Sequence, residues 1–380
     1  MQNIASLPAD HFDGLLGRLP AGLDLDLLAR QTKAIERKRQ IVSGADLLRL
    51  ALARGPGGLS LSATAAWATM LGFAELSDPG VKFRLDKAVG FLDAVLSSQL
   101  AAKTPGAAVR WPGRILNACD GSCFREPGAK TTSWRLHAVY DLGRGGFGHL
   151  ELTDQHGAER IERGAPVAGE IRIGDRYFAR APRLQQFREQ SAYQADFIVR
   201  VGWNAFSLTR QDGTAFDLIT HLGTLPADMA AHEVMVRAKL GPPKLDPPKL
   251  GPRERQGEPA LPLRLIVQRK TAEATEAARA TLRREASRKQ KILDPRSLVA
   301  AEFIILATSL PSAGYLAQDV LSVYRLRWQI ELAFKRLKSL LHMDRLPTRT
   351  ERASRSWLTS HLILALLCDD LSQDFLESSP

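Results

Sequence analysis

The stretch from residue 324 to residue 338 reads Tyr324-Arg-Leu-Arg-Trp-Gln-Ile-Glu-Leu-Ala-Phe-Lys-Arg-Leu-Lys338. It contains neither proline nor glycine and predicts one continuous helix. At about 100° per residue, four polar side chains share an arc of about 60°. These are Tyr324, Arg327, Glu331 and Lys338. The apolar residues of the segment fall to another side, so this stripe is separate from the predicted packing face.

Two interpretations of the stripe are open. Arg327 and Glu331 are four residues apart, and such pairs are common on solvent-exposed, salt-bridged helices. Alternatively, a single carboxylate among cations is typical of a metal ligand flanked by groups that bind phosphates. The rest of the chain favours the second interpretation.

The composition is that of a globular protein with a basic bias. The 380 residues include 52 Lys and Arg against 41 Asp and Glu, a formal net charge of +11, and 44% are hydrophobic. This excludes a collagen, a coiled-coil rod and a fully disordered chain. The length predicts two or three domains, at about 100–200 residues each. The charge favours a polyanionic partner, with nucleic acid ahead of an anionic membrane surface.

The three cysteines and the hydropathy pattern indicate a cytoplasmic protein. Cys119, Cys123 and Cys368 cannot form a disulfide framework, and they lack the paired spacing of a structural zinc site. No apolar run reaches the roughly 18 residues that a membrane span requires. We therefore expect a reducing cytoplasm and no membrane partner.

The residues before about 105 predict an all-helical region. Leucine, alanine and arginine recur there at helical spacing, and glycine and proline end the segments. The part from Leu59 through Leu71-Gly72-Phe73 to a helix near Val81 has the rhythm of a helix-turn-helix. An α-hairpin that only packs on itself is an equally weighted alternative.

From Arg114 the pattern changes to strands. Segments 114–120, 134–141 and 148–154 predict three antiparallel strands, and 170–175, a helix near 184–189 and 196–201 follow. This succession predicts a mixed α/β sheet layered with helices. Further strands near 264–268 and 303–308 flank a helix from Thr271. The proline-rich stretch 239–253 predicts an extended loop. Residues 231–300 hold 16 basic and 8 acidic side chains, which predicts a basic insertion into the sheet.

The chain resembles the DDE transposases of the bacterial insertion-sequence-4 family. Its C-terminal signature is Tyr, two residues, Arg, three residues, Glu, six residues, Lys, and the stripe above reproduces it. Asp120-Gly-Ser resembles the setting of the first catalytic aspartate. Asp175-Arg176-Tyr177 resembles that of the second, although the family's glycine between Arg and Tyr is absent.

The resemblance implies a ribonuclease-H-like core in which Asp120, Asp175 and Glu331 are catalytic and bind two Mg2+ ions, with Mn2+ as a substitute. Carboxylate oxygens suit Mg2+, and paired ions suit phosphodiester displacement. It further implies that DNA is contacted by four residues: Tyr324, Arg327, Lys338 and Arg176.

The resemblance, taken with the composition, predicts four parts. Residues 1–110 form a helical DNA-binding region, 111–201 the first part of the core, 202–310 a β-containing basic insertion and 311–380 the C-terminal helical part of the core. Its implied function is cleavage at terminal inverted repeats and 3'-OH strand transfer into target DNA. Double-stranded DNA is the implied partner, and a homodimer on DNA is the implied assembly. The implied location is the bacterial cytoplasm, associated with the nucleoid.

Two other functions stay open. A catalytically inactive relic would bind DNA and regulate transposition, and a ribonuclease-H-like endonuclease would cut another substrate. Intact Asp120, Asp175 and Glu331 argue against the relic.

Several other acidic, aromatic and histidine side chains are expected to have structural roles. Asp141 and Asp154 precede turn-like residues and predict hairpin positions, and Asp196 opens a strand as a possible cap. Trp203 is expected in the core, with stacking on a flipped base as the alternative. Trp328 is expected to pack. No metal role is assigned to three histidines, His137, His149 and His156.

Overall fold

The computed structural model describes residues 7–106, 108, 110–241 and 259–378, and the chain divides into two compact units. Unit 1 consists of Met1–Gly106, Gly121–Gly157 and Ile330–Pro380, and unit 2 of Ala107–Asp120 and Ala158–Gln329. The chain passes from one unit to the other after Gly106, within strand β1 (Ile115–Phe124), after Gly157 and within helix α12 (Trp328–Ser339). Each unit is described by itself.

Unit 1 begins with helices, as the sequence predicts. Serine and aspartate caps set their starts: Ser43, Ser60 and Ser77 accept hydrogen bonds from backbone amides three residues on, and Asp24 does the same for Leu27. The helices are α1 (Leu7–Leu16), α2 (Leu25–Gln31), α3 (Gly44–Arg54), α4 (Leu61–Met70), α5 (Asp78–Lys87) and α6 (Val89–Ala101).

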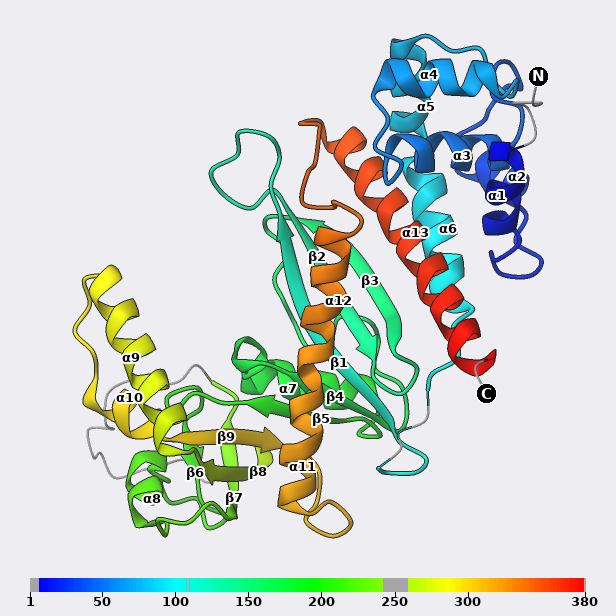
Figure 1. The fold of residues 1–380 in the computed structure, drawn as a ribbon. Coiled ribbons are helices and arrows are strands. Elements are labelled where there is room, and N and C mark those ends of the chain that lie inside the picture. The colour runs from blue at the N-terminus through cyan, green and yellow to red at the C-terminus, as the bar shows by residue number, and fades with distance from the viewer. Residues whose placement is uncertain (1–6, 107, 109, 242–258, 379–380) are drawn as a thin grey trace. The chain divides into compact units, whose positions relative to one another are not determined.

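The long C-terminal helix α13 (Glu351–Ser378) packs against this bundle, chiefly along α6 (Figure 1). Its buried apolar residues recur at helical spacing, which gives it one face to bury. They include Leu358, Leu362, Ile363 and Leu366, and on α6 Phe91, Leu92 and Val95 are buried. Near this face, Arg355 Nε donates to Asp93 Oδ2 at 2.9 Å. The N-terminal helices are thus held by residues more than two hundred positions away.

A hairpin of β2 (Trp134–Asp141) and β3 (Gly146–Asp154) completes unit 1, and β3 contacts α6 and α13. Asp141 organises its turn, since Oδ1 accepts from the amides of Gly143 and Arg144, both at 2.9 Å. Phe147 of β3 lies against Phe334 of α12, with ring centroids 6.3 Å apart. The predicted hairpin role of Asp141 is confirmed.

Unit 2 is built on a sheet in the order β1-β4-β5-β9-β8-β7-β6. The pairs β1–β4 and β4–β5 are parallel, and every later pair is antiparallel. The strands after β1 are β4 (Glu170–Gly174), β5 (Asp196–Arg200), β6 (Leu208–Thr209), β7 (Ala231–Lys239), β8 (Ala260–Arg269) and β9 (Phe303–Thr308). This confirms the predicted mixed α/β class. Strands β6 to β9, all within the predicted insertion, continue the core sheet.

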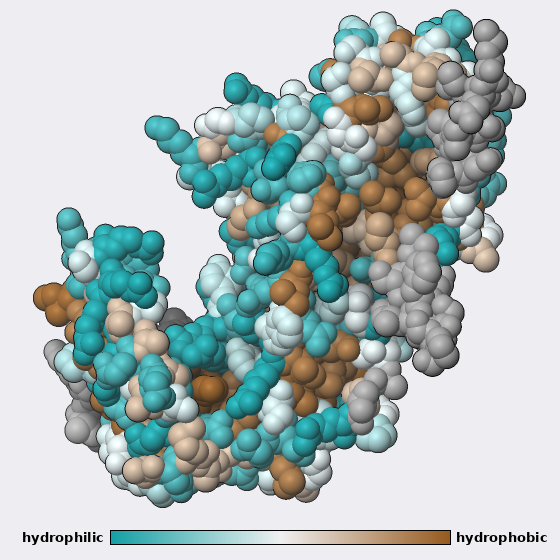
Figure 2. Space-filling view, in the orientation of Figure 1, coloured by the Kyte–Doolittle hydropathy of each residue, from teal (hydrophilic) through white to brown (hydrophobic). Residues whose placement is uncertain are grey.

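Short helices accompany this sheet: η1 (Arg176–Phe178), α7 (Ala181–Gln190), α8 (Leu218–Thr224), α10 (Pro295–Ala300), α11 (Ala317–Tyr324) and η2 (Arg325–Arg327). The longer α9 (Ala272–Arg288) follows β8, and hydrophilic residues dominate its surface in Figure 2. Its sequence alternates alanine with arginine and glutamate, so it has little apolar surface to bury.

One prediction about secondary structure is wrong. The segment 324–338 is not one regular α-helix, because the 3-10 turn η2 separates α11 from α12. A 3-10 turn advances by about 120° per residue rather than 100°. The predicted 60° stripe therefore does not hold across Arg325–Arg327. The proline-rich prediction for 239–253 lies mostly outside the described residues.

Candidate active site

The register of the sheet places Asp120 and Asp175 at the same level on neighbouring strands of unit 2. Strand β1 pairs with β4 in parallel, with Ala118 opposite Ile173, and each aspartate follows its partner residue by two positions. Neighbouring strands lie about 4.8 Å apart. Asp175 directly follows β4, where its Oδ1 accepts from the Tyr177 amide at 2.8 Å. Both aspartate side chains are half-buried.

A buried ion pair on β4 is linked to β1 by a side-chain hydrogen bond. Arg172 Nε donates to Glu170 Oε1 at 2.6 Å, and the two side chains are 2% and 1% exposed. Asn117 Nδ2 of β1 donates to the same oxygen at 2.9 Å. Arg172 Nη1 also donates to the carbonyl oxygens of Ile161 and Arg163, both at 2.7 Å. Glu170 and Arg172 both lie on β4, so a slip of β1 against β4 would leave their ion pair intact but would break the buried hydrogen bond from Asn117, at a cost of about 1–3 kcal/mol.

Arg327 and Tyr324 lie beside the aspartates. Arg327 Nη1 is 4.0 Å from Asp120 Oδ2. Burial raises the pKa of the Tyr324 phenol, and the nearby charges of Arg327 and Arg200 lower it. Tyr324 therefore stays a neutral hydrogen-bonding group beside a guanidinium, the pair that a phosphate oxygen prefers.

Arg176 also belongs to this cluster. Partial burial and the charge of Arg200 lower the pKa of Arg176, while Tyr324 and Asp175 raise it. Burial, with the charges of Arg200 and Arg176, lowers the pKa of Lys270 to about 8. Unit 2 therefore brings together Asp120, Asp175, Arg176, Tyr324 and Arg327 of the predicted site.

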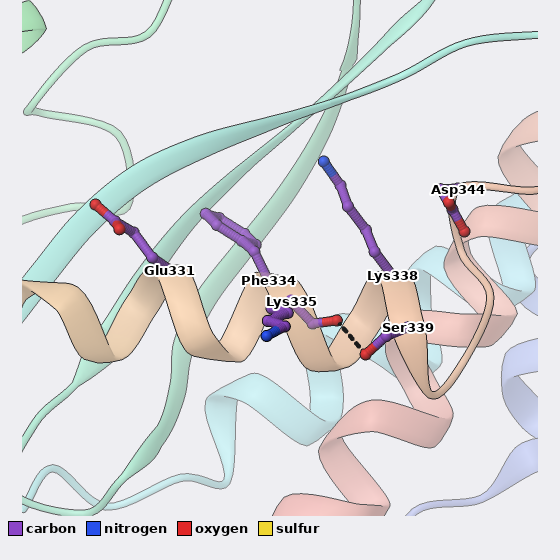
Figure 3. A pocket seen from close by; sticks show the side chains of 6 residues that line it. All are labelled: Glu331, Phe334, Lys335, Lys338, Ser339 and Asp344. Carbon is purple, nitrogen blue, oxygen red and sulfur yellow. Dashed lines mark hydrogen bonds between the residues drawn. The ribbon is translucent and has the colours of Figure 1, made fainter.

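Glu331 and Lys338 belong to unit 1, on α12. Figure 3 shows Glu331, Phe334 and Lys338 rising from the same side of this helix, as their spacing predicts. They line a hollow of about 440 Å³, shared with Lys335, Ser339 and Asp344. Lys338 Nζ lies 5.4 Å from the ring centroid of Phe124, a cation–π distance. The glutamate carboxylate is exposed beside two ammonium groups.

The donor chemistry of the aspartate pair fits a divalent cation, because carboxylates are the hard oxygen ligands that such ions prefer. Among the described residues there is no group of three His, Cys, Asp or Glu side chains that could hold a metal ion. The structure brings two of the three predicted carboxylates, those of Asp120 and Asp175, to neighbouring strands.

Trp328 and Asp196 differ from expectation. Trp328 is 50% exposed, so the prediction that it packs is wrong; it follows η2, whose extra rotation changes which residues face the core. Asp196 is not a cap. It forms ion pairs with Arg114, at 2.6 Å, and with Arg188, and it accepts from Ser309.

Trp203 is half-buried rather than fully enclosed. Its Nε1 donates to Ser297 Oγ at 3.1 Å, and the guanidinium of Arg296 lies 4.3 Å from its ring centroid. Asp154 accepts from the His156 amide at 2.9 Å, which confirms its predicted turn role.

Sequence reasoning missed Arg200 and Lys270. Neither lies in a motif, and both follow strands whose spatial order the sequence does not reveal. The available signal was that Arg200 ends a strand and Lys270 follows one, as catalytic and binding residues of parallel sheets do.

A mixed sheet that aligns two aspartates on neighbouring strands, with an arginine and a tyrosine beside them, is typical of one class of protein: enzymes that cleave nucleic acid. The family model for the transposase DDE domain matches residues 111–367. The chain belongs to this family and is a DNA transposase. Transposases of this family use divalent metal ions and act on DNA.

Relatives with similar sequences match over almost their whole length. The putative transposase InsL of insertion sequence element IS186A from Escherichia coli strain K12 is 36% identical over 371 residues, covering 98% of this chain and 96% of InsL. The transposase of insertion sequence element IS421 from Escherichia coli is 36% identical over 372 residues, with the same coverage.

Among solved structures, a piggyBac transposase synaptic complex with hairpin DNA is similar at a TM-score of 0.39 and 10% identity. The match covers 96% of this chain and 76% of that one. No helix among the described residues is both long and apolar enough to cross a membrane.

Proposed function

We propose that this transposase cuts DNA at the terminal inverted repeats of its element and joins the freed 3' ends to target DNA, using Asp120, Asp175 and Glu331. The observation that carries the proposal is the parallel register of Ala118 and Ile173, which aligns two aspartates on neighbouring strands. Glu331, on α12 four residues after the arginine that faces Asp120, completes the carboxylate set.

The reaction consists of two displacements at phosphorus. Water attacks the phosphodiester at the element end, the bond to the 3' oxygen breaks, and that oxygen leaves as a 3' hydroxyl. The hydroxyl then attacks a phosphodiester of the target, forming a new bond as the target's own 3' oxygen leaves. No covalent enzyme intermediate is needed. Two Mg2+ ions, when bound by the three carboxylates, would activate the attacking oxygen and stabilise the leaving one.

The remaining site residues hold DNA. Arg327 and Tyr324 present a guanidinium and a phenol next to Asp120, where they can hold the phosphate beside the cut. Two further cations contact the DNA strand. Lys338 lies two turns after Glu331, and Arg176 directly follows Asp175. Such contacts position the DNA without reading its sequence.

The parts of the chain divide this work. Residues 1–110 recognise the inverted repeats, and α4 with α5, which pack together, form the helix-turn-helix. Residues 111–201 and 311–380 form the ribonuclease-H-like core, and 202–310 the basic insertion. A homodimer assembled on DNA, in the bacterial cytoplasm at the nucleoid, brings both ends together.

The test is nicking of a duplex that carries the terminal repeat, by the purified full chain with Mg2+ or Mn2+. Asp120→Ala, Asp175→Ala and Glu331→Ala should each abolish nicking while the duplex still binds. Asp154→Ala is the matched control, because Asp154 is an exposed turn residue. Undiminished nicking by Glu331→Ala would overturn the assignment. If the unmodified chain binds the duplex but does not nick it, the protein is the catalytically inactive relic. If it nicks DNA but does not transfer strands, it is an endonuclease with another substrate.

A further inference from the structure

Three cations gather at one edge of the unit 2 sheet. Arg176 follows β4, Arg200 ends β5 and Lys270 follows β8. Strands β4 and β5 are parallel, and β9 runs antiparallel to both β5 and β8. Strand β8 therefore runs in the same direction as β4 and β5. The C-terminal ends of all three strands meet at the edge that also carries Asp175.

The charge of Arg200 acts on both Arg176 and Lys270, and that of Arg176 acts on Lys270. The charges that depress the pKa of Lys270 to about 8, in addition to burial, are those of Arg200 and Arg176. In the described ranges, no ion pair of Arg200 or Lys270 with a carboxylate is found. The wider edge also contains Asp175 and Tyr324, which raise the pKa of Arg176 but do not neutralise three positive charges.

Hydrogen-bonding capacity is left over at the same place. Arg200 Nε is buried and has no hydrogen-bond partner. Lys270 Nζ donates to the carbonyl oxygen of Ala301 at 2.6 Å, which uses one of the three ammonium hydrogens. A cluster of like charges with unused hydrogen-bond donors is energetically unfavourable in the absence of a ligand. An anion with several acceptor oxygens would stabilise it.

We propose that Arg200 and Lys270, with Arg176, bind a backbone phosphate of the DNA, separate from the phosphate held by Arg327 and Tyr324. This inference rests on the proposed function, which brings DNA to the neighbouring aspartates. A phosphodiester offers acceptor oxygens and a negative charge to the unused donors of these three cations. Arg200 belongs to the predicted core and Lys270 to the predicted insertion. The subsite therefore contains residues of both predicted parts, which share one sheet.

The first test measures binding of the full chain to the terminal-repeat duplex, by fluorescence anisotropy over a range of KCl concentrations. Arg200→Gln and Lys270→Gln should each weaken binding about 5- to 30-fold near 0.15 M salt, and should reduce the slope of log K against log salt by about one. Lys270→Arg should keep most of the affinity. Lys291→Gln is the matched control, because Lys291 is an exposed cation after α9 in the same unit.

The second test locates the phosphate. Single methylphosphonate linkages, which remove one negative charge, are placed along each strand. At one position the unmodified chain should lose affinity while Lys270→Gln loses nothing further. Unchanged salt slopes for both variants, or additive losses at every position, would overturn the subsite. Loss of affinity in Lys270→Arg equal to that in Lys270→Gln would also overturn it, since a second cation should serve.

Failure of the subsite and failure of the proposed function give different results. If the unmodified chain nicks DNA and the variants bind with unchanged slopes, the subsite is wrong and the function stands. If the unmodified chain does not nick but the variants show the expected losses, the phosphate contact stands and the cleavage assignment fails.

Discussion

Asp120 and Asp175 each follow, by two residues, one member of the pair Ala118 and Ile173 on adjacent parallel strands. Two carboxylates on neighbouring strands repel each other, and the guanidinium of Arg327, 4.0 Å from Asp120, offsets part of that repulsion. The backbone pairing of β1 with β4 and the buried hydrogen bond from Asn117 to Glu170 hold the two strands in this register. The positions of the two aspartates are therefore determined by buried contacts of the protein itself and do not depend on bound DNA.

Replacing Arg327 should impair cleavage more than binding. Arg327→Lys keeps the charge but loses the planar fork that holds a phosphate oxygen, so we expect the single-turnover nicking rate to fall about 10- to 100-fold. Binding of the terminal-repeat duplex should fall less than about 5-fold. Arg325→Lys is the control, because Arg325 is exposed in the same 3-10 turn. Equal rates for both variants would contradict the assigned role.

Breaking the buried ion pair should unfold the core. Glu170→Ala leaves the Arg172 guanidinium buried and without its partner, which should cost about 3–5 kcal/mol of unfolding free energy. Replacing both residues by apolar ones, as in E170L with R172M, should cost less than the single change. The exposed pair of Glu285 and Lys289 gives the comparison, since Glu285→Gln should change stability by under about 0.5 kcal/mol. Urea denaturation measures all three.

His361 should make stability depend on pH. Burial lowers its pKa to about 4, although Nδ1 donates to the carbonyl oxygen of Trp357 at 2.7 Å. In the unfolded chain the pKa of this histidine is near 6.5, so between pH 6.5 and pH 4 the unfolded state binds more protons than the folded state. The contribution of His361 to the unfolding free energy is therefore fully present above about pH 6.5 and is lost as the pH falls toward 4.

The check is the difference in unfolding free energy between the unmodified chain and His361→Gln, measured at pH 7 and at pH 4.5. The unmodified chain should lose about 2 kcal/mol more than the variant over this range. Equal losses in both proteins would show that His361 does not stay neutral in the folded state.

Two tryptophans should respond differently to truncation. Trp328 is 50% exposed, so Trp328→Ala should leave the unfolding free energy within about 0.5 kcal/mol. Trp357 is 8% exposed and packs against His361 with ring centroids 3.8 Å apart, so Trp357→Ala should cost about 3–5 kcal/mol. Thermal melting of the two variants compares them directly, and similar shifts would contradict the difference in burial.

Local pattern predicted most of the secondary structure. The N-terminal helices end and begin at serine, aspartate and glycine signals, and the strands near Asp120, Asp175 and Asp196 follow alternating or buried apolar runs. The 3-10 turn at Arg325–Arg327 was not predictable in this way. Its sequence suits an α-helix as well, so local pattern does not distinguish the two.

The sequence by itself determined the succession of elements, the basic bias and the chemical identity of the site, because spacing along one helix and motif residues beside one strand are local properties. Only the tertiary structure decided which residues meet. The parallel register that sets Asp120 beside Asp175, and the strand order that brings Lys270 to Arg200 and Arg176, join segments tens of residues apart. Those pairings depend on buried partners in other strands, and no local pattern contains that information.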